Sequence, residues 1–156
     1  MEQLIGNNLE IFLRLGVALG LGMIIGVERV LHGKPAGMRT YAMVAMGSSL
    51  FVIVSEIIRQ GLFNSPGFVA SMMPANIIVG VGFLGAGLIV LRGSHLTGLT
   101  TASGLWVSAG IGIAAGFGLF NLAAIATILT IFIFTILFFV EEPFKKISQK
   151  TNDEVE

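Results

Sequence analysis

The sequence has 156 residues, of which 54% are hydrophobic and 12% are charged. Ordinary soluble domains carry about 25% charged residues, so this composition indicates a membrane protein. Nine Lys and Arg residues balance nine Asp and Glu residues, and this neutral total gives no reason to expect a nucleic-acid partner. The sequence has no Cys, which excludes disulfides, thiolate metal sites and cysteine nucleophiles.

Long stretches without charge mark the predicted spans. The stretch Leu99–Val140 holds 42 residues, about 63 Å of helix, whereas the hydrocarbon is only about 30 Å thick. It therefore folds as two helices, with a break at Gly116–Asn121. In the uncharged stretch Gln60–Leu91, only the part near and after Pro74 is a span, because turn residues precede it. The sequence predicts an all-α polytopic membrane protein with five transmembrane helices, near residues 9–27, 38–58, 71–91, 99–117 and 120–140.

The positions of Lys and Arg predict the orientation, because cytoplasmic loops are rich in these residues. Only Arg14 and Arg59 belong to one side, so we expect the C-terminus in the cytoplasm and the N-terminus outside. Met1–Gln3 lacks the basic segment of a signal peptide, and we expect the first apolar run to stay as a span. Residues 1–140 form the predicted transmembrane domain and residues 141–156 a short cytoplasmic polar tail. The basic residues of the cytoplasmic side are Arg29, Lys34, Arg39, Arg92, Lys145, Lys146 and Lys150.

The 21 glycines indicate close packing between helices. Small residues at every fourth position let helix backbones approach each other, and packing of this kind drives helix association in a bilayer. The last span instead carries many Phe, Ile and Leu residues, so we expect it at the lipid-facing periphery. The glycines that we expect at helix contacts are Gly20, Gly22, Gly26, Gly80, Gly82, Gly85, Gly87, Gly104 and Gly112.

The first and third spans resemble each other at an offset of 60 residues. The two predicted helical hairpins, helices 1 and 2 and helices 3 and 4, also have the same orientation. These observations predict a parallel repeat about the membrane normal. The matched pairs include Gly20 and Gly80, Gly22 and Gly82, Gly33 and Gly93 and, after a slip of one residue, Gly37 and Gly98, and Thr40 and Thr101.

The segment Gly80–Gly85 matches the glycine pattern of a dinucleotide-binding loop. That site needs a preceding strand and an acidic residue about twenty positions later. The segment lies inside an apolar span instead, and no Asp or Glu follows it before Glu141. We therefore expect helix packing and no nucleotide.

Charged residues cluster at the predicted cytoplasmic edge of the first two spans. Glu28 can pair with Arg29 beside it or with Arg39 across the hairpin, where Thr40 follows. Charges near hydrocarbon are costly unless they are paired or hydrated, and they are functional candidates for that reason. Two interpretations stay open: a salt bridge that fixes the register of the hairpin, and an ion or headgroup site at the cytoplasmic mouth.

Further polar candidates lie in the second half of the chain. Asn76 needs a hydrogen bond to a neighbouring helix, and Thr100 and Thr101 are expected to cap the fourth helix more than to bind a ligand. Arg92 lies in the same predicted cytoplasmic layer as Glu28. We take these four residues, with the cluster of Glu28, Arg29, Arg39 and Thr40, as candidate ligand- or partner-binding residues.

The carboxylates do not form a predicted metal site. Mg²⁺ prefers one or two carboxylates with retained waters. The carboxylates within or beside the spans are divided between the two membrane faces; they are Glu10, Glu28, Glu56, Glu141 and Glu142. We therefore expect no metal site, no cofactor and no enzymatic activity. A homo-oligomer stays open.

Four motifs together resemble the MgtC/SapB family of bacterial inner-membrane proteins. They cover about residues 15–115 in the same order, and Trp106 follows the last of them. Departures at Asn76 and at Ser103–Gly104 concern polar details. The motifs are Gly20–Arg29, Gly37–Thr40, Gly80–Gly87 and Gly98–Ala102.

The resemblance implies a bacterial inner-membrane protein linked to magnesium homeostasis, to growth at low magnesium and, in pathogens, to survival inside host cells. It implies a regulator of other membrane complexes, such as an ATP synthase, with an ion transporter or channel as the alternative. Many members carry a cytoplasmic C-terminal domain, and we expect none of its functions here. The expected partners are the lipid bilayer and such membrane complexes, and no nucleic acid is expected.

Overall fold

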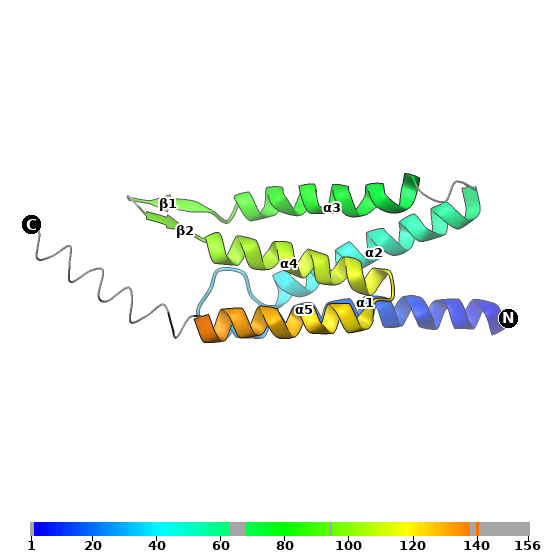
Figure 1. The fold of residues 1–156 in the computed structure, drawn as a ribbon, viewed down its shortest axis with the longest axis horizontal. Coiled ribbons are helices and arrows are strands. Elements are labelled where there is room, and N and C mark those ends of the chain that lie inside the picture. Colours follow the sequence, from blue (N-terminus) through cyan, green and yellow to red (C-terminus); the bar gives the residue numbers. More distant parts are fainter. Residues whose placement is uncertain (1, 63–67, 94, 138–139, 141–156) are drawn as a thin grey trace, which may run out of the picture.

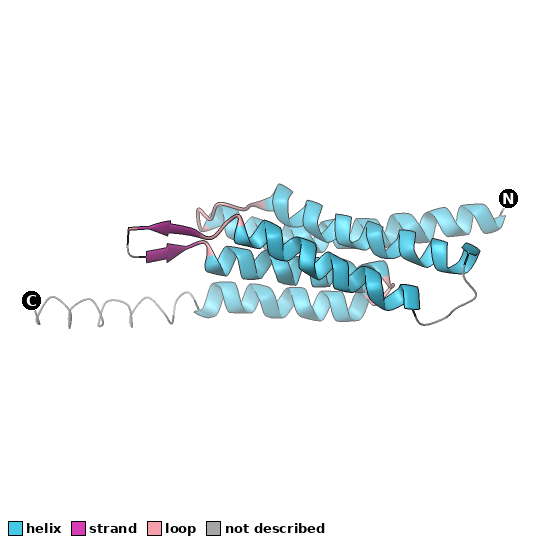
Figure 2. Ribbon diagram, turned by 90° about the horizontal axis from the view of Figure 1, so that it is seen from above, coloured by secondary structure: helices cyan, strands magenta, loops and turns pink. Residues whose placement is uncertain are grey.

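The computed structural model describes residues 2–62, 68–93, 95–137 and 140, and it forms an elongated helical bundle (Figure 1). The predicted tail, residues 141–156, lies outside the described residues. The helices confirm the predicted all-α class, and one short antiparallel hairpin joins α3 to α4 (Figure 2). The elements are α1 (Glu2–Leu31), α2 (Met38–Leu62), α3 (Phe68–Ala86), β1 (Val90–Arg92), β2 (His95–Thr97), α4 (Leu99–Gly116), α5 (Phe120–Phe132) and the π-helix η1 (Ile133–Leu137).

Four of the helices are long and apolar enough to cross a membrane. The apolar part of the remaining helix, α3, is shorter in the described chain and covers Met72–Ala86. The α1–α2 connection and the β-hairpin lie at one end of the bundle, which we call the hairpin end (Figure 1). The N-terminus and the α4–α5 connection lie at the opposite end (Figure 1). The four spans are Asn8–Leu31, Met38–Arg59, Leu99–Gly116 and Phe120–Leu137.

The third helix ends earlier than predicted. It stops at Ala86 rather than near residue 91, and the chain continues into β1 and β2, where Arg92 pairs with His95. The hairpin turns at Gly93, whose φ of 61° lies in the left-handed region that favours glycine. The uncharged stretch of the sequence predicts an apolar segment here, but it does not predict the residue at which the helix ends.

Helix α4 lies at the centre of the bundle and packs against the other four helices. A Cβ on Gly112 would collide with the backbone of Ala45 on α2, and one on Gly104 would lie 2.5 Å from the Tyr41 hydroxyl. On α1, Gly22 and Gly26 face α2 in the same way. These four glycines set the close approach of α1, α2 and α4.

Other glycines of the predicted packing set lie elsewhere. Gly85 makes ordinary contact with Ala102, and the atoms nearest to a Cβ on Gly87 belong to its own helix turn. Gly20, Gly80 and Gly82 have nothing within 4 Å of a Cβ position. Gly20, Gly80 and Gly82 therefore leave open space on the surface of their helices.

Helix α5 lies at the periphery, as predicted from its bulky side chains. Leu122, Ile125 and Ile128 are more than half exposed on its outer face. The π-helical turn η1 continues it, and Phe134 in that turn points inward, where only 7% of it is exposed. Its ring edge would meet a Cβ on Gly104, so this glycine also makes room for Phe134.

The two helical hairpins share local backbone features. Gly33 and Gly93, which are 60 residues apart, both have a φ of 61°. The carbonyls of Gly37 and Gly98 each accept a hydrogen bond from the residue four positions later. Only the second connection forms a β-hairpin, however, and Gly22 is packed whereas Gly82 is open. The parallel repeat stays a prediction that these features support.

Candidate functional site

The charged cluster of the first hairpin is built around a buried ion pair. Glu28 and Arg29 close α1, their carboxylate and guanidinium form an ion pair, and 7% and 3% of these residues are exposed. Arg39 is exposed and forms no ion pair with any described residue. The pairing partner of Glu28 is therefore its neighbour in sequence rather than Arg39 across the hairpin.

His32 completes this cluster from the next turn of the chain. Its Nδ1 lies 2.9 Å from the Glu28 carbonyl oxygen and 2.9 Å from Glu28 Oε1. One ring nitrogen carries at most one proton, so it cannot donate a full hydrogen bond to both the Glu28 carbonyl oxygen and Glu28 Oε1. Glu28 Oε1 is buried and has no properly oriented hydrogen bond within the described chain.

Arg29 is also held by the π-helical turn η1, which continues α5. Its guanidinium carbon lies 3.7 Å from the centre of the Phe134 ring, which is a cation–π contact. The sequence analysis missed this contact, because nothing in a uniformly apolar helix shows which Phe turns inward. The π-helical turn at Ile133–Leu137 is the feature that brings Phe134 there.

A pocket opens beside this pair at the hairpin end. Its volume is about 730 Å³, and its polar lining includes the side chains of Arg29, Lys34 and Arg92. The start of α4 lines it too, through Gly98–Thr101, and the apolar wall comes from the hairpin and η1. We call this site the basic pocket. It brings together Arg29, Arg92, Thr100 and Thr101, four of the predicted site residues; Glu28, Arg39, Thr40 and Asn76 do not line it.

The predicted hydroxyl cap of α4 is wrong. Gly98, with a φ of 91°, is the N-cap residue, and no side chain caps the helix. Thr100 and Thr101 instead lie inside the first turn, and Thr101 is buried. Glycine suits this position because its φ is left-handed and because a Cβ there would collide with the Leu88 carbonyl.

Tyr41 is the polar centre of the core, and the sequence analysis missed it. It is fully buried, donates its hydroxyl proton to the Thr101 carbonyl at 3.2 Å, and accepts at its own carbonyl from Ser108 Oγ at 3.0 Å. A Cβ on Gly22 would lie 2.6 Å from that carbonyl oxygen. The available signal was that this residue is the single Tyr of the sequence and follows Arg39 and Thr40 directly.

Asn76 lies in a separate apolar groove between α2 and α3. The groove has a volume of about 480 Å³, and Gly47, Phe51 and Gly80 are among its lining residues. Asn76 is exposed, and its amide makes no hydrogen bond to any other described residue. We call this site the α2–α3 groove. The expected bond between Asn76 and a neighbouring helix is therefore absent within the described chain.

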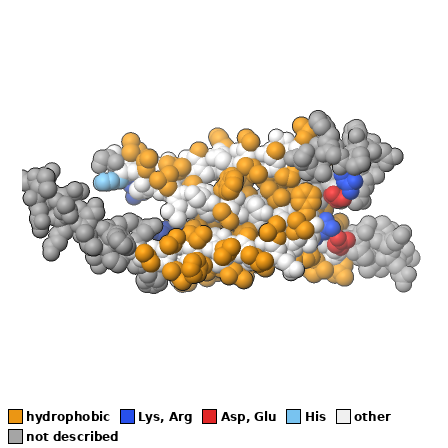
Figure 3. All heavy atoms as spheres, viewed as in Figure 1, with side chains coloured by type: hydrophobic (Ala, Val, Ile, Leu, Met, Phe, Trp, Pro, Cys, Tyr) orange, Lys and Arg blue, Asp and Glu red, His pale blue; other side chains and the backbone are white. Residues whose placement is uncertain are grey.

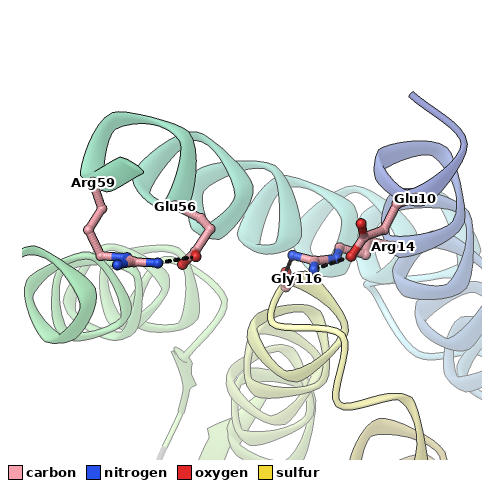
Figure 4. Close-up of polar contacts among 5 residues, drawn as sticks. All are labelled: Glu10, Arg14, Glu56, Arg59 and Gly116. Carbon is pink, nitrogen blue, oxygen red and sulfur yellow. Dashed lines mark hydrogen bonds and ion pairs between the residues drawn. The ribbon is translucent and has the colours of Figure 1, made fainter. Parts of the chain in front are cut away.

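Basic and acidic side chains gather at the opposite end of the bundle (Figure 3), where Arg14 and Arg59 each pair with a carboxylate (Figure 4). Arg14 pairs with Glu10 and donates to the Gly116 carbonyl at 2.8 Å, at the end of α4. A cation at the C-terminus of a helix stabilises its dipole. Arg59 pairs with Glu56 at 2.5 Å on α2.

In the residues that the structure describes, no group of three or more His, Cys, Asp or Glu side chains could hold a metal ion.

Comparison with known proteins shows which family the chain resembles. Residues 15–142 match the MgtC family. YhiD of Escherichia coli K12, named as a candidate magnesium transporter, is 37% identical over 126 residues, which are 80% of this chain and 59% of YhiD. MgtC of Brucella abortus is 42% identical over 111 residues, 71% of this chain and 44% of that protein.

SapB of Bacillus subtilis is 40% identical over 103 residues, 62% of this chain and 43% of that protein. The chain thus spans about half the length of these curated relatives. No solved structure matches the chain.

Proposed function

The chain belongs to the MgtC family of membrane proteins, and from this premise we propose that it serves magnesium homeostasis by binding other membrane proteins, without enzymatic activity. The name of its relative YhiD supports the link to magnesium. We further propose that it lies in the bacterial inner membrane with the hairpin end toward the cytoplasm. The bias of Lys and Arg toward that end supports this orientation.

The observation that carries the proposed partner binding is the exposed Asn76 amide in the α2–α3 groove. Asn76 lies near the middle of α3, within an otherwise apolar stretch. A polar group in hydrocarbon needs a hydrogen-bond partner, since lipid offers none. No described residue forms a hydrogen bond with the Asn76 amide. A second molecule could therefore supply this hydrogen bond.

The shape of the groove fits a helix as that second molecule. Gly47 and Gly80 both line it, and neither has an atom within 4 Å of a Cβ position. Small residues allow the backbone of another transmembrane helix to come close, and a polar residue on that helix can bond Asn76. We therefore propose a transmembrane helix of a partner complex as the occupant.

Two glycines on the same helix provide the test. Gly80 lines the groove and Gly82 does not, yet both are exposed and have open space at the Cβ position. Gly80→Leu places a bulky side chain in the groove from a position whose Cβ has no atom within 4 Å, and Gly82→Leu is its matched control. Each variant is expressed in the native membrane, cross-linked, isolated through an affinity tag and analysed by mass spectrometry.

We expect wild type and Gly82→Leu to recover the same membrane complex, and Gly80→Leu to lose most of it. Asn76→Leu is expected to weaken recovery as well, because the hydrogen bond is lost. Equal recovery with all four proteins, or recovery of no membrane protein with wild type, would contradict the proposal.

Ion transport is the second candidate function, and the Glu28 carboxylate favours it. Glu28 Oε1 is buried without an oriented hydrogen bond, and a carboxylate oxygen inside a membrane protein can mark the path of a cation. Transport predicts magnesium flux that depends on Glu28, whereas partner binding predicts none.

A further inference from the structure

We propose that the basic pocket at the hairpin end binds a phosphate group. The pocket has a volume of about 730 Å³ and takes Arg29, Lys34 and Arg92 from three different segments of the chain. None of the described residues that line it is acidic. Glu28, which pairs with Arg29, does not line the pocket, so Arg92 adds positive charge to a cavity that no described carboxylate lines, and this charge favours an anion.

Arg29 is pre-organised for this role. Its Nε–H is taken by Glu28, and its guanidinium stacks on Phe134 at 3.7 Å. The two Nη groups have no hydrogen-bond acceptor among the described residues. A fixed, planar pair of donors matches two oxygens of a phosphate, which binds more tightly when the donors are already oriented.

The other donors come from β1 and from the start of α4. Arg92 ends β1, is exposed and forms no ion pair in the described part of the chain. The first turn of α4 begins at Gly98 without a side-chain cap, and Thr100 adds a hydroxyl. Uncapped backbone N–H groups and the helix dipole add to the attraction that Arg29 and Arg92 exert on an anion.

The pocket is apolar on its remaining walls, through residues such as Leu88, Leu99 and Leu137. A phospholipid could place its headgroup phosphate among the cations and its chains along these walls. A free phosphate could use the same cations alone. The shared chemistry is the phosphate group, and the experiment separates the two sources.

The test uses the purified chain in an uncharged detergent and follows thermal unfolding. One series adds short-chain phosphatidylglycerol, a second adds inorganic phosphate, and a third adds chloride at matched ionic strength. We expect phosphatidylglycerol or phosphate, but not chloride, to raise the Tm of wild type in a saturable way. Stabilisation by the lipid alone identifies a lipid headgroup, and equal stabilisation by inorganic phosphate identifies a free phosphate.

Two Arg variants then locate the binding site. Arg92→Gln removes an exposed cation of the pocket, and Arg39→Gln removes an exposed cation on the first turn of α2, outside the pocket. We expect Arg92→Gln to weaken the apparent affinity about tenfold, as the loss of one charge-assisted bond of about 1.5 kcal/mol predicts. Arg39→Gln should bind as wild type does. Equal binding by the two variants, or no stabilisation of wild type by either phosphate ligand, would overturn the proposal.

Discussion

Two glycines of α4 differ in the space available for an added methyl group. Gly112 faces the backbone of Ala45, whereas Gly110 has nothing within 4 Å of its Cβ position. We expect Gly112→Ala to lower the free energy of unfolding by roughly 1–3 kcal/mol through overpacking. Gly110→Ala should leave it unchanged or raise it by up to about 1 kcal/mol, because Ala favours helix. Thermal unfolding in detergent compares the two, and equal Tm values would contradict the packing described for α4.

The buried and exposed carboxylates should also differ in their effect on stability. Glu28→Gln leaves the buried Arg29 charge uncompensated, which we expect to cost about 3–5 kcal/mol. Glu10 is the matched control, since it pairs with Arg14 but its side chain is 58% exposed; pairs at exposed positions contribute about 0–1 kcal/mol. Denaturant titration in mixed micelles measures both variants. A larger loss for Glu10→Gln than for Glu28→Gln would contradict the burial of the Glu28–Arg29 pair.

At the residue level, charge was easier to predict than packing. Glu28 and Arg29 stand out in the sequence because a charge at a membrane edge needs an explanation. Tyr41 and Phe134 gave no comparable signal. In a water-soluble helix the polar face shows which side points outward, but in a bilayer both the core and the surroundings are apolar. The sequence therefore does not show that Phe134 turns inward while Phe132 stays half exposed.

The α3–α4 connection is the element whose geometry depends most on glycine. Gly98 has a φ of 91° and a Cβ there would collide with the Leu88 carbonyl, whereas Gly93 has a φ of 61° and open space. We expect Gly93→Ala to cost about 1–2 kcal/mol from backbone strain alone, and Gly98→Ala to cost clearly more. Gly33→Ala should resemble Gly93→Ala, because Gly33 shares its φ and its open surroundings. Chemical unfolding of the three variants checks this order, and a smaller loss for Gly98→Ala than for Gly93→Ala would contradict it.

The number of helices could be predicted because hydrocarbon thickness limits how long an uncharged helix can be. The end of α3 could not be predicted in the same way. The residues up to Leu91 are apolar and would suit either a helix or a strand. The strands β1 and β2 have only three residues each. The basic pocket depends on this hairpin, so only its separate residues, such as Arg92 and Thr100, could be proposed from the sequence.

For the whole molecule, the orientation in the membrane can be tested by labelling. The natural sequence has no Cys, so single cysteines report one position each. We expect a membrane-impermeant maleimide to label Glu10→Cys in cells whose outer membrane is permeabilised, and to label Lys34→Cys only after the inner membrane is opened. Labelling in the reverse order would contradict the proposed cytoplasmic hairpin end.

The central claim is that the chain acts by binding membrane proteins rather than by conducting ions. The most direct measurement is magnesium influx into liposomes that contain the purified chain and a magnesium-sensitive dye, with protein-free liposomes and Glu28→Gln as controls. Our account predicts that wild type, Glu28→Gln and protein-free liposomes give the same influx. Influx that wild type supports above the level of protein-free liposomes would contradict it.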